Sequence, residues 1–70
     1  MTEPLVARPF GDTREVSAYL SRPAATLRQW RHRGLGPRSF RLYGRTMYRW
    51  TDVDKWVAEQ EAKTASGGTA

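Results

Sequence analysis

The sequence predicts one small α+β domain in which a β-hairpin lies between helices. Apolar side chains recur at helical spacing in three separate stretches. Between the second and third of these, two short stretches rich in aromatic and β-branched residues flank a glycine. The 70 residues include no cysteine, so packing alone must stabilise the core. We expect a flexible N-terminal arm (1–9), a folded domain (10–61) and a disordered tail (62–70).

The first helix is predicted to start at Asp12. The carboxylate of this residue can cap the free amides of the first turn, and Glu15, three residues later, completes a capping box. The helix is expected to stop before Pro23, because proline lacks an amide and suits a helix start. One apolar face of this helix follows i, i+3, i+4 spacing: Val16, Tyr19 and Leu20.

A second helix is predicted over residues 24–33. Pro23 suits its start, and Gly34 stands where a left-handed C-cap is wanted. Leu27 and Trp30 point inward on the helical wheel. The short turn between the two helices, at 20–23, is typical of a helix-turn-helix.

A hairpin is predicted next, from residues 39–42 and 46–50, with Gly44 at its tip. Thr51 is expected to cap a third helix, with Asp54 at the box position. The elements together predict a small winged helix-turn-helix: a helix-turn-helix, a β-hairpin wing and a C-terminal helix. The apolar stripe of the third helix is Val53, Trp56 and Val57.

The charge distribution predicts the partner. Between Val16 and Thr51 the chain has no aspartate or glutamate but eight arginines, and all seven carboxylates lie outside this window. A polyanion releases condensed counterions when arginines neutralise its phosphates. A GC-rich genome would explain arginine over lysine, but not the missing acids. The eight arginines are Arg22, Arg28, Arg31, Arg33, Arg38, Arg41, Arg45 and Arg49.

The second helix carries side chains suited to reading base edges. An arginine can donate two hydrogen bonds to guanine, a glutamine can pair with adenine, and an alanine can touch a thymine methyl group. An ordinary solvated helix face would normally include glutamates, so we predict a recognition helix in the major groove of double-stranded DNA. Arg31 lies nearer the core edge and is expected to reach a phosphate. The outward residues are Ala25, Arg28, Gln29 and His32, flanked by Arg22, Thr26 and Arg33.

The hairpin is predicted to act as a wing. Arg45 at the tip, with Arg41 and Arg49 on the arms and Thr46 beside them, suits a narrow minor groove, where negative potential is concentrated. The alternative is an ordinary solvated hairpin turn.

Other classes of function are disfavoured. His32 has no cysteine or carboxylate in its helix, so we expect no metal site, no cofactor and no enzymatic activity. Trp30 and Trp56 lie on apolar stripes, which favours core positions over base-stacking platforms. No apolar run is long enough to span a bilayer and no signal region is evident, so we expect a cytoplasmic protein that binds no membrane.

Two stretches carry a family resemblance, EVSAYLSRPAATLRQWRHRG and GPRSFRLYGRTMYRWTDVDKWV. They resemble the small excisionase/AlpA-type group of MerR-like winged helix-turn-helix proteins, over residues 12–58. The most telling parts are Glu15-Val16, Tyr19-Leu20, Ala25-Thr26-Leu27-Arg28, Trp30, Gly34, Tyr48-Arg49, Asp52-Val53 and Trp56.

The resemblance implies a cytoplasmic DNA-binding protein of phages or integrative elements, often a recombination directionality factor. Such factors bind repeated sites in attachment DNA, bend it and direct an integrase toward excision. The base-reading helix of the family corresponds to 25–33 and its wing to 42–48. This chain departs from the family in the turn, where Ser21 and Arg22 replace a glycine and an apolar residue.

Three functions therefore compete: an excisionase, a transcriptional regulator on the same fold, and a basic RNA-binding protein. A hairpin between helices argues against the last, since RNA readers usually expose aromatic side chains on a sheet or use a GXXG loop. The sequence does not separate the first two. The partners we expect are double-stranded DNA, an integrase and neighbouring copies of the chain on DNA.

Overall fold

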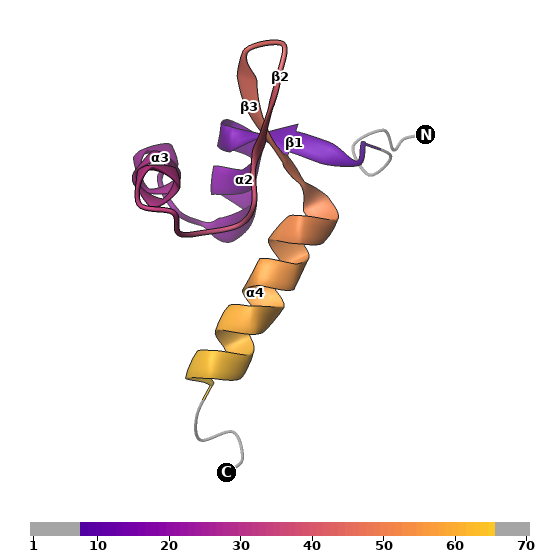
Figure 1. Ribbon diagram of the computed structural model, residues 1–70. Coiled ribbons are helices and arrows are strands. Elements are labelled where there is room, and N and C mark those ends of the chain that lie inside the picture. Colours follow the sequence, from indigo (N-terminus) through magenta and orange to yellow (C-terminus); the bar gives the residue numbers. More distant parts are fainter. Residues whose placement is uncertain (1–7, 66–70) are drawn as a thin grey trace.

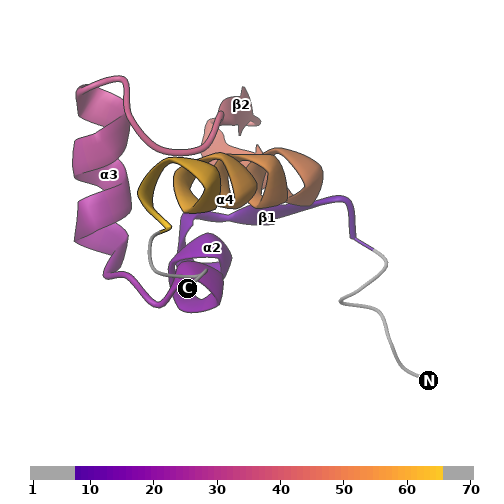
Figure 2. The same ribbon diagram turned by 90° about the horizontal axis from the view of Figure 1, so that it is seen from below.

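The computed structural model describes residues 8–65 and has the predicted winged helix-turn-helix architecture (Figure 1). Its helices and hairpin follow the predicted order, helix, turn, helix, hairpin and helix. In Figure 2, the helices α2 and α3 cross steeply, as a helix-turn-helix requires. The elements are β1 (Phe10–Asp12), α2 (Thr13–Leu20), α3 (Ala24–His32), β2 (Phe40–Leu42), β3 (Arg45–Arg49) and α4 (Trp50–Thr64).

The sheet contains a strand that the sequence did not predict. Its order is β1-β3-β2, and both pairings are antiparallel. Gly11 of β1 lies opposite Tyr48 of β3, and the Pro9 carbonyl accepts a hydrogen bond of 3.1 Å from the Trp50 amide. A segment of three residues is too short to show the alternation of apolar and polar side chains that marks a strand. The pairing with β3 is what makes β1 a strand. The end of the expected N-terminal arm is thus held against the domain.

A small core joins the three helices to the sheet. Each of α2, α3, β3 and α4 contributes one fully buried side chain, and the half-buried Trp30 and Trp50 pack against this cluster. Trp30 also meets the half-buried Trp56, with ring centroids 5.2 Å apart. The predicted packing role of Trp30 and Trp56 is therefore confirmed. The buried side chains are Val16, Leu27, Tyr48 and Val53.

Two predictions about helix ends and faces were wrong. Tyr19 is 56% exposed, and its hydroxyl donates a hydrogen bond of 2.6 Å to Asp54. This bond and the nearby carboxylate charge raise the pKa of Tyr19 above its usual value. Asp54 is therefore not part of a capping box with Thr51. The last helix instead begins two residues earlier, with Arg49 and not Thr51 at the N-cap position, and it has no side-chain cap.

The capping box at the start of α2 is confirmed. The Glu15 amide donates to Asp12 Oδ1, and the Asp12 amide donates to Glu15 Oε1, both at 2.9 Å. The helix ends at Ser21, whose backbone takes a left-handed conformation with φ 56°. This is the conformation that a glycine adopts most easily, and the resembling family has a glycine in this turn. Ser21 therefore keeps the turn geometry at a conformational cost of about 1 kcal/mol.

We expect Ser21→Gly to raise the free energy of unfolding by about 0.5–1 kcal/mol, because glycine adopts φ 56° without a clash. The measurement is urea denaturation followed by circular dichroism. Arg22→Gly is the matched control: Arg22 is not among the positive-φ residues, so glycine there should only add freedom to the unfolded chain and lower stability. An equal effect of both substitutions would contradict the prediction.

Gly34 provides the predicted end of α3. Its φ is 72°, its amide donates to the Arg31 carbonyl, and the Leu35 amide donates to the Trp30 carbonyl at 2.7 Å. This pair of bonds is a Schellman motif. The helix stops at His32, one residue before the predicted end.

The hairpin tip is Tyr43-Gly44. Both residues have positive φ, 52° and 78°, which defines a two-residue type I′ turn. Gly44 is at the tip as predicted, but Arg45 is not, because it is the first residue of β3 and pairs with Leu42.

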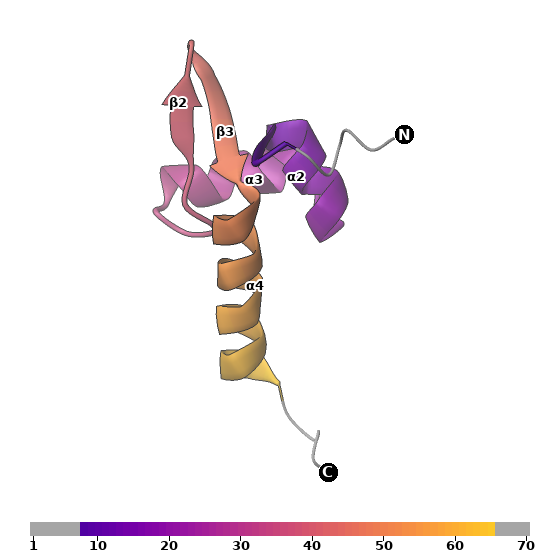
Figure 3. The ribbon, with the colours of Figure 1, turned by 90° about the vertical axis from the view of Figure 1, so that its right-hand side faces the viewer.

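The last helix projects away from the hairpin, as Figures 1 and 3 show. It continues to Thr64, so residues 62–64 are helical although the sequence assigned them to the tail. The rest of the predicted tail (66–70) and most of the predicted arm (1–7) lie outside the described residues. Among residues 8–65, no helix is both long and apolar enough to cross a membrane.

Candidate nucleic-acid interface

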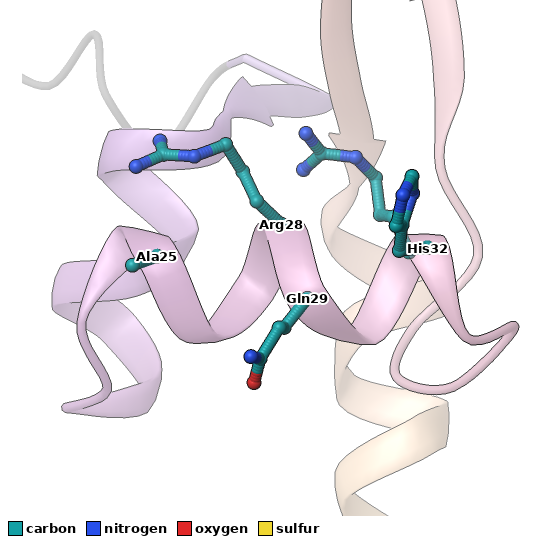
Figure 4. Close-up of a pocket in the computed structure, with 5 residues that line it drawn as sticks. Ala25, Arg28, Gln29 and His32 are labelled. Atoms are coloured by element: carbon teal, nitrogen blue, oxygen red, sulfur yellow. The ribbon is translucent and has the colours of Figure 1, made fainter.

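The outer face of α3 presents the predicted base-reading side chains. Ala25, Arg28, Gln29 and His32 are exposed, whereas Leu27 on the opposite side is fully buried. Figure 4 shows Arg28 and Gln29 diverging from the helix, so they can reach different base pairs. The outward orientation predicted for these residues is therefore confirmed. Together with Arg31 they line one open depression along the helix: Ala25, Arg28, Gln29, Arg31 and His32.

The residues that flank this face are less uniform. Thr26 is half-buried, whereas Arg33, just after α3, is exposed. Arg22 is exposed in the turn before α3. Its amide donates a hydrogen bond of 3.0 Å to the Ser17 carbonyl, and its carbonyl accepts a hydrogen bond from the Ser17 hydroxyl. The backbone of the turn is thus fixed, and the DNA contacts of these three side chains remain predictions.

The arginines of α3 are not neutralised within the described part of the chain. The ion pairs of residues 8–65 use other arginines, so Arg28 and Arg31 of α3, and Arg33 just after it, have no carboxylate partner among these residues. Since α3 itself contains no acid, its face is cationic and suits phosphate-lined grooves. The ion pairs are Arg8–Glu15, Arg38–Asp52 and Arg45–Asp12.

Arg31 has a structural role that the sequence did not reveal. It is half-buried, and its Nη1 donates to the Tyr48 hydroxyl at 2.9 Å and to Thr13 Oγ1 at 3.4 Å. These bonds join α3 to β3 and α2, so Arg31 holds the recognition helix against the sheet. Because Arg31 lies at the edge of the core and has a long aliphatic stem, its guanidinium can reach either toward the sheet or toward solvent. The phosphate contact predicted for Arg31 remains a prediction.

The four wing residues do not share one face. Arg41 pairs with Thr46, and the period of two places Thr46 on the same face as Tyr48, which is bound by α3. Arg45 and Arg49 lie on the opposite face. The four predicted wing residues can therefore contact DNA together only if the walls of one groove lie against both faces of the hairpin.

Arg49 packs on the outer face of the sheet. Its guanidinium lies over the Phe40 ring, 5.8 Å from the centroid, and Phe10 meets the same ring edge-on at 5.9 Å. A cation over an aromatic face is attracted by the ring quadrupole. Arg49 thus stabilises the base of the hairpin, far from the tip, and its predicted DNA contact is not supported by this position.

Asp12 links the wing to the first helix. Its Oδ1 caps α2, while its Oδ2 accepts a hydrogen bond of 3.1 Å from Arg45 Nη2. On the other face of the hairpin, Arg41 Nη2 donates to the Gly44 carbonyl at 3.0 Å. Arg41 and Arg45, two of the three predicted wing arginines, are thus held by hydrogen bonds in the free protein, and both remain exposed.

Sequence reasoning missed one feature of the wing, the side chain of Tyr43, which is fully exposed at the tip. The signal was present, because a two-residue turn between Leu42 and Arg45 puts Tyr43 at its first position. Residues 8–65 contain no group of three or more His, Cys, Asp or Glu side chains arranged to hold a metal ion.

A family model described as a helix-turn-helix domain matches residues 12–61. The chain belongs to this helix-turn-helix family. The match begins at the capping residue of α2 and includes α3, the hairpin and most of α4. The protein is therefore a DNA-binding helix-turn-helix domain with α3 as its second helix. Searches of the curated proteins and of the solved structures found no match.

We expect Asp12→Asn to raise the affinity of this helix-turn-helix domain for DNA about two- to fivefold at low salt, with a steeper salt dependence. Asparagine keeps the oxygen that caps α2 but removes the negative charge beside Arg45. Stability should change by less than about 1 kcal/mol, because the Arg45 side chain is 70% exposed and water screens the ion pair.

Fluorescence anisotropy of a labelled duplex measures this effect. Glu61→Gln is the control, since it changes the net charge equally on α4, which points away from the hairpin (Figure 3). Equal gains from both variants would mean that net charge, and not the freed Arg45, explains the effect.

Proposed function

We propose that this protein is an excisionase-type architectural factor that binds repeated sites in attachment DNA, bends the DNA and directs an integrase toward excision. Its family includes excisionase- and AlpA-like DNA-binding proteins. The resemblance of residues 12–58 to the excisionase/AlpA-type group also supports the proposal. In this proposal the protein has no catalytic role and works in the cytoplasm, where its DNA is.

The observation that carries the proposal is an exposed, acid-free face of the second helix next to a protruding hairpin, both within a very small domain. The open outer face of α3 carries Arg28 and Gln29, and a paired β-hairpin extends beyond it. We infer that α3 enters the major groove and that the hairpin follows the adjacent minor groove.

The small size of the domain implies that several copies act together. Single modules of this kind bury about 600–1,000 Å² on DNA, so one copy should bind weakly and in a salt-sensitive manner. Excision requires a long, bent complex, and we propose that copies bind direct repeats head to tail. The hairpin side of one copy would contact a helix of the next, an asymmetric contact that does not close on itself.

Gel-shift titrations on the attachment region of its own element test this proposal. We expect successive complexes that fill cooperatively and bend the DNA increasingly. In a recombination assay with the matching integrase, the protein should switch the product from integrated to excised DNA. A single unbent complex on a promoter palindrome, without any effect on the integrase, would instead indicate a transcriptional regulator on the same fold.

A further inference from the structure

The tip of the hairpin exposes two apolar side chains. Tyr43 is 101% exposed and the adjacent Leu42 is 41% exposed. Figures 1 and 3 show that the hairpin end protrudes from the rest of the domain, opposite the direction of α4. Isolated exposed apolar residues are common on protein surfaces. The exposure of Leu42 and Tyr43 is less ordinary, because the backbone at Tyr43 has a conformation that is unfavourable for a tyrosine.

The backbone at Tyr43 is unfavourable for a tyrosine. Its φ of 52° is left-handed, and the first position of a type I′ turn favours asparagine, aspartate or glycine. The ring makes no stabilising contact in return, since it is fully exposed. A tyrosine at this position therefore stabilises the hairpin less than an asparagine or a glycine would.

The turn beneath the ring is closed by strand pairing and by a side-chain hydrogen bond. Leu42 pairs with Arg45, and Arg41 Nη2 donates a hydrogen bond of 3.0 Å to the Gly44 carbonyl. Space around Gly44 is open, since a β-carbon added to this residue would meet no atom within 4 Å. The tip is therefore a narrow, two-residue turn with a defined hydrogen-bonding pattern.

The charges beside the tip identify the surface that it fits. Arg41 and Arg45 lie on opposite faces of the hairpin, and no acid occurs between Val16 and Thr51. The minor groove has a row of phosphates on each side and apolar deoxyribose faces along its walls, while its floor carries the hydrogen-bonding edges of the bases. An apolar tip with a guanidinium on each face matches this cross-section.

We propose that Leu42 and Tyr43 form an apolar wedge that enters the minor groove and opens one base step, bending the DNA. Arg41 and Arg45 would then bind phosphates of the two opposite strands. Apolar side chains inserted between base pairs unstack them and kink the duplex toward the major groove. The inference rests on DNA binding by the domain and supplies the bend that the proposed function requires.

The decisive variant is Tyr43→Asn, because it should move stability and DNA binding in opposite directions. Asparagine before glycine is the preferred type I′ pair, so the melting temperature should rise. Affinity for DNA should fall about fivefold or more, and the bend should decrease. Tyr43→Phe keeps the ring and should bind and bend DNA within about twofold of the wild type.

The probe is a 30-bp duplex whose sequence the wild-type chain enriches from a random pool. Fluorophores at its two ends report bending by energy transfer, and 2-aminopurine placed at successive steps reports unstacking by increased fluorescence. We expect one step to brighten with the wild type and with Tyr43→Phe, and none with Tyr43→Asn.

Tyr43→Asn protein that binds and bends this duplex like the wild type would overturn the wedge. Unchanged DNA binding and bending with a lost effect on the integrase would also overturn it, and would assign the ring to a protein contact. If bending depends on Tyr43 but the wild type leaves the integrase product unchanged, the wedge stands and the excision function fails.

Discussion

Replacing Arg28 by alanine should lower the affinity of the domain for its specific site by about 10- to 100-fold. The guanidinium is exposed on α3 and has no carboxylate partner among residues 8–65, so it is free to bind a guanine edge. Gln29→Ala should cost about 1–3 kcal/mol and relax discrimination at a different base pair, because the two side chains diverge. Anisotropy titrations on the selected duplex and on single-base variants measure both effects.

Arg33→Ala is the matched control for the recognition helix. Arg33 is exposed but lies beyond the end of α3, so its loss should weaken specific and unrelated DNA alike. Unchanged specific binding by Gln29→Ala, with the helix content of the domain retained, would show that this face of α3 does not enter the groove.

Gly11→Ala should destabilise the domain by roughly 3 kcal/mol, a large share of the stability of so small a fold. A β-carbon at this position would collide with the Trp50 ring and would lie 3.0 Å from Glu15 Oε1. Gly11 is buried, so either Trp50 leaves its place beside the core or β1 separates from β3. Urea denaturation measures the loss.

Gly34→Ala separates this steric effect from conformational strain. Gly34 has open space around it but a φ of 72°, so alanine there should cost only about 1–2 kcal/mol through its backbone. Gly11 is not among the positive-φ residues, and its cost should come from packing alone. A smaller loss for Gly11→Ala than for Gly34→Ala would mean that β1 yields easily and contributes little to the fold.

The sequence by itself determined several features that depend on near neighbours, although the local cap predicted at Thr51 was wrong. The capping box between Asp12 and Glu15 and the left-handed C-cap at Gly34 involve residues within one or two turns, and both were predicted. Helical periodicity likewise separated the exposed Arg28 and Gln29 from the buried Leu27. The acid-free window identified the kind of partner, because charge composition acts without regard to detailed geometry.

Only the tertiary structure decided the contacts between distant segments. The strand β1 exists because β3 pairs with it, and Arg31 turns to the Tyr48 hydroxyl because the sheet brings that group beside α3. The register of the hairpin placed Arg45 next to Asp12, 33 positions away in the chain, and left Tyr43 alone at the tip. Such pairings depend on the folded arrangement of the whole domain, so the local conformational preferences of the residues do not predict them.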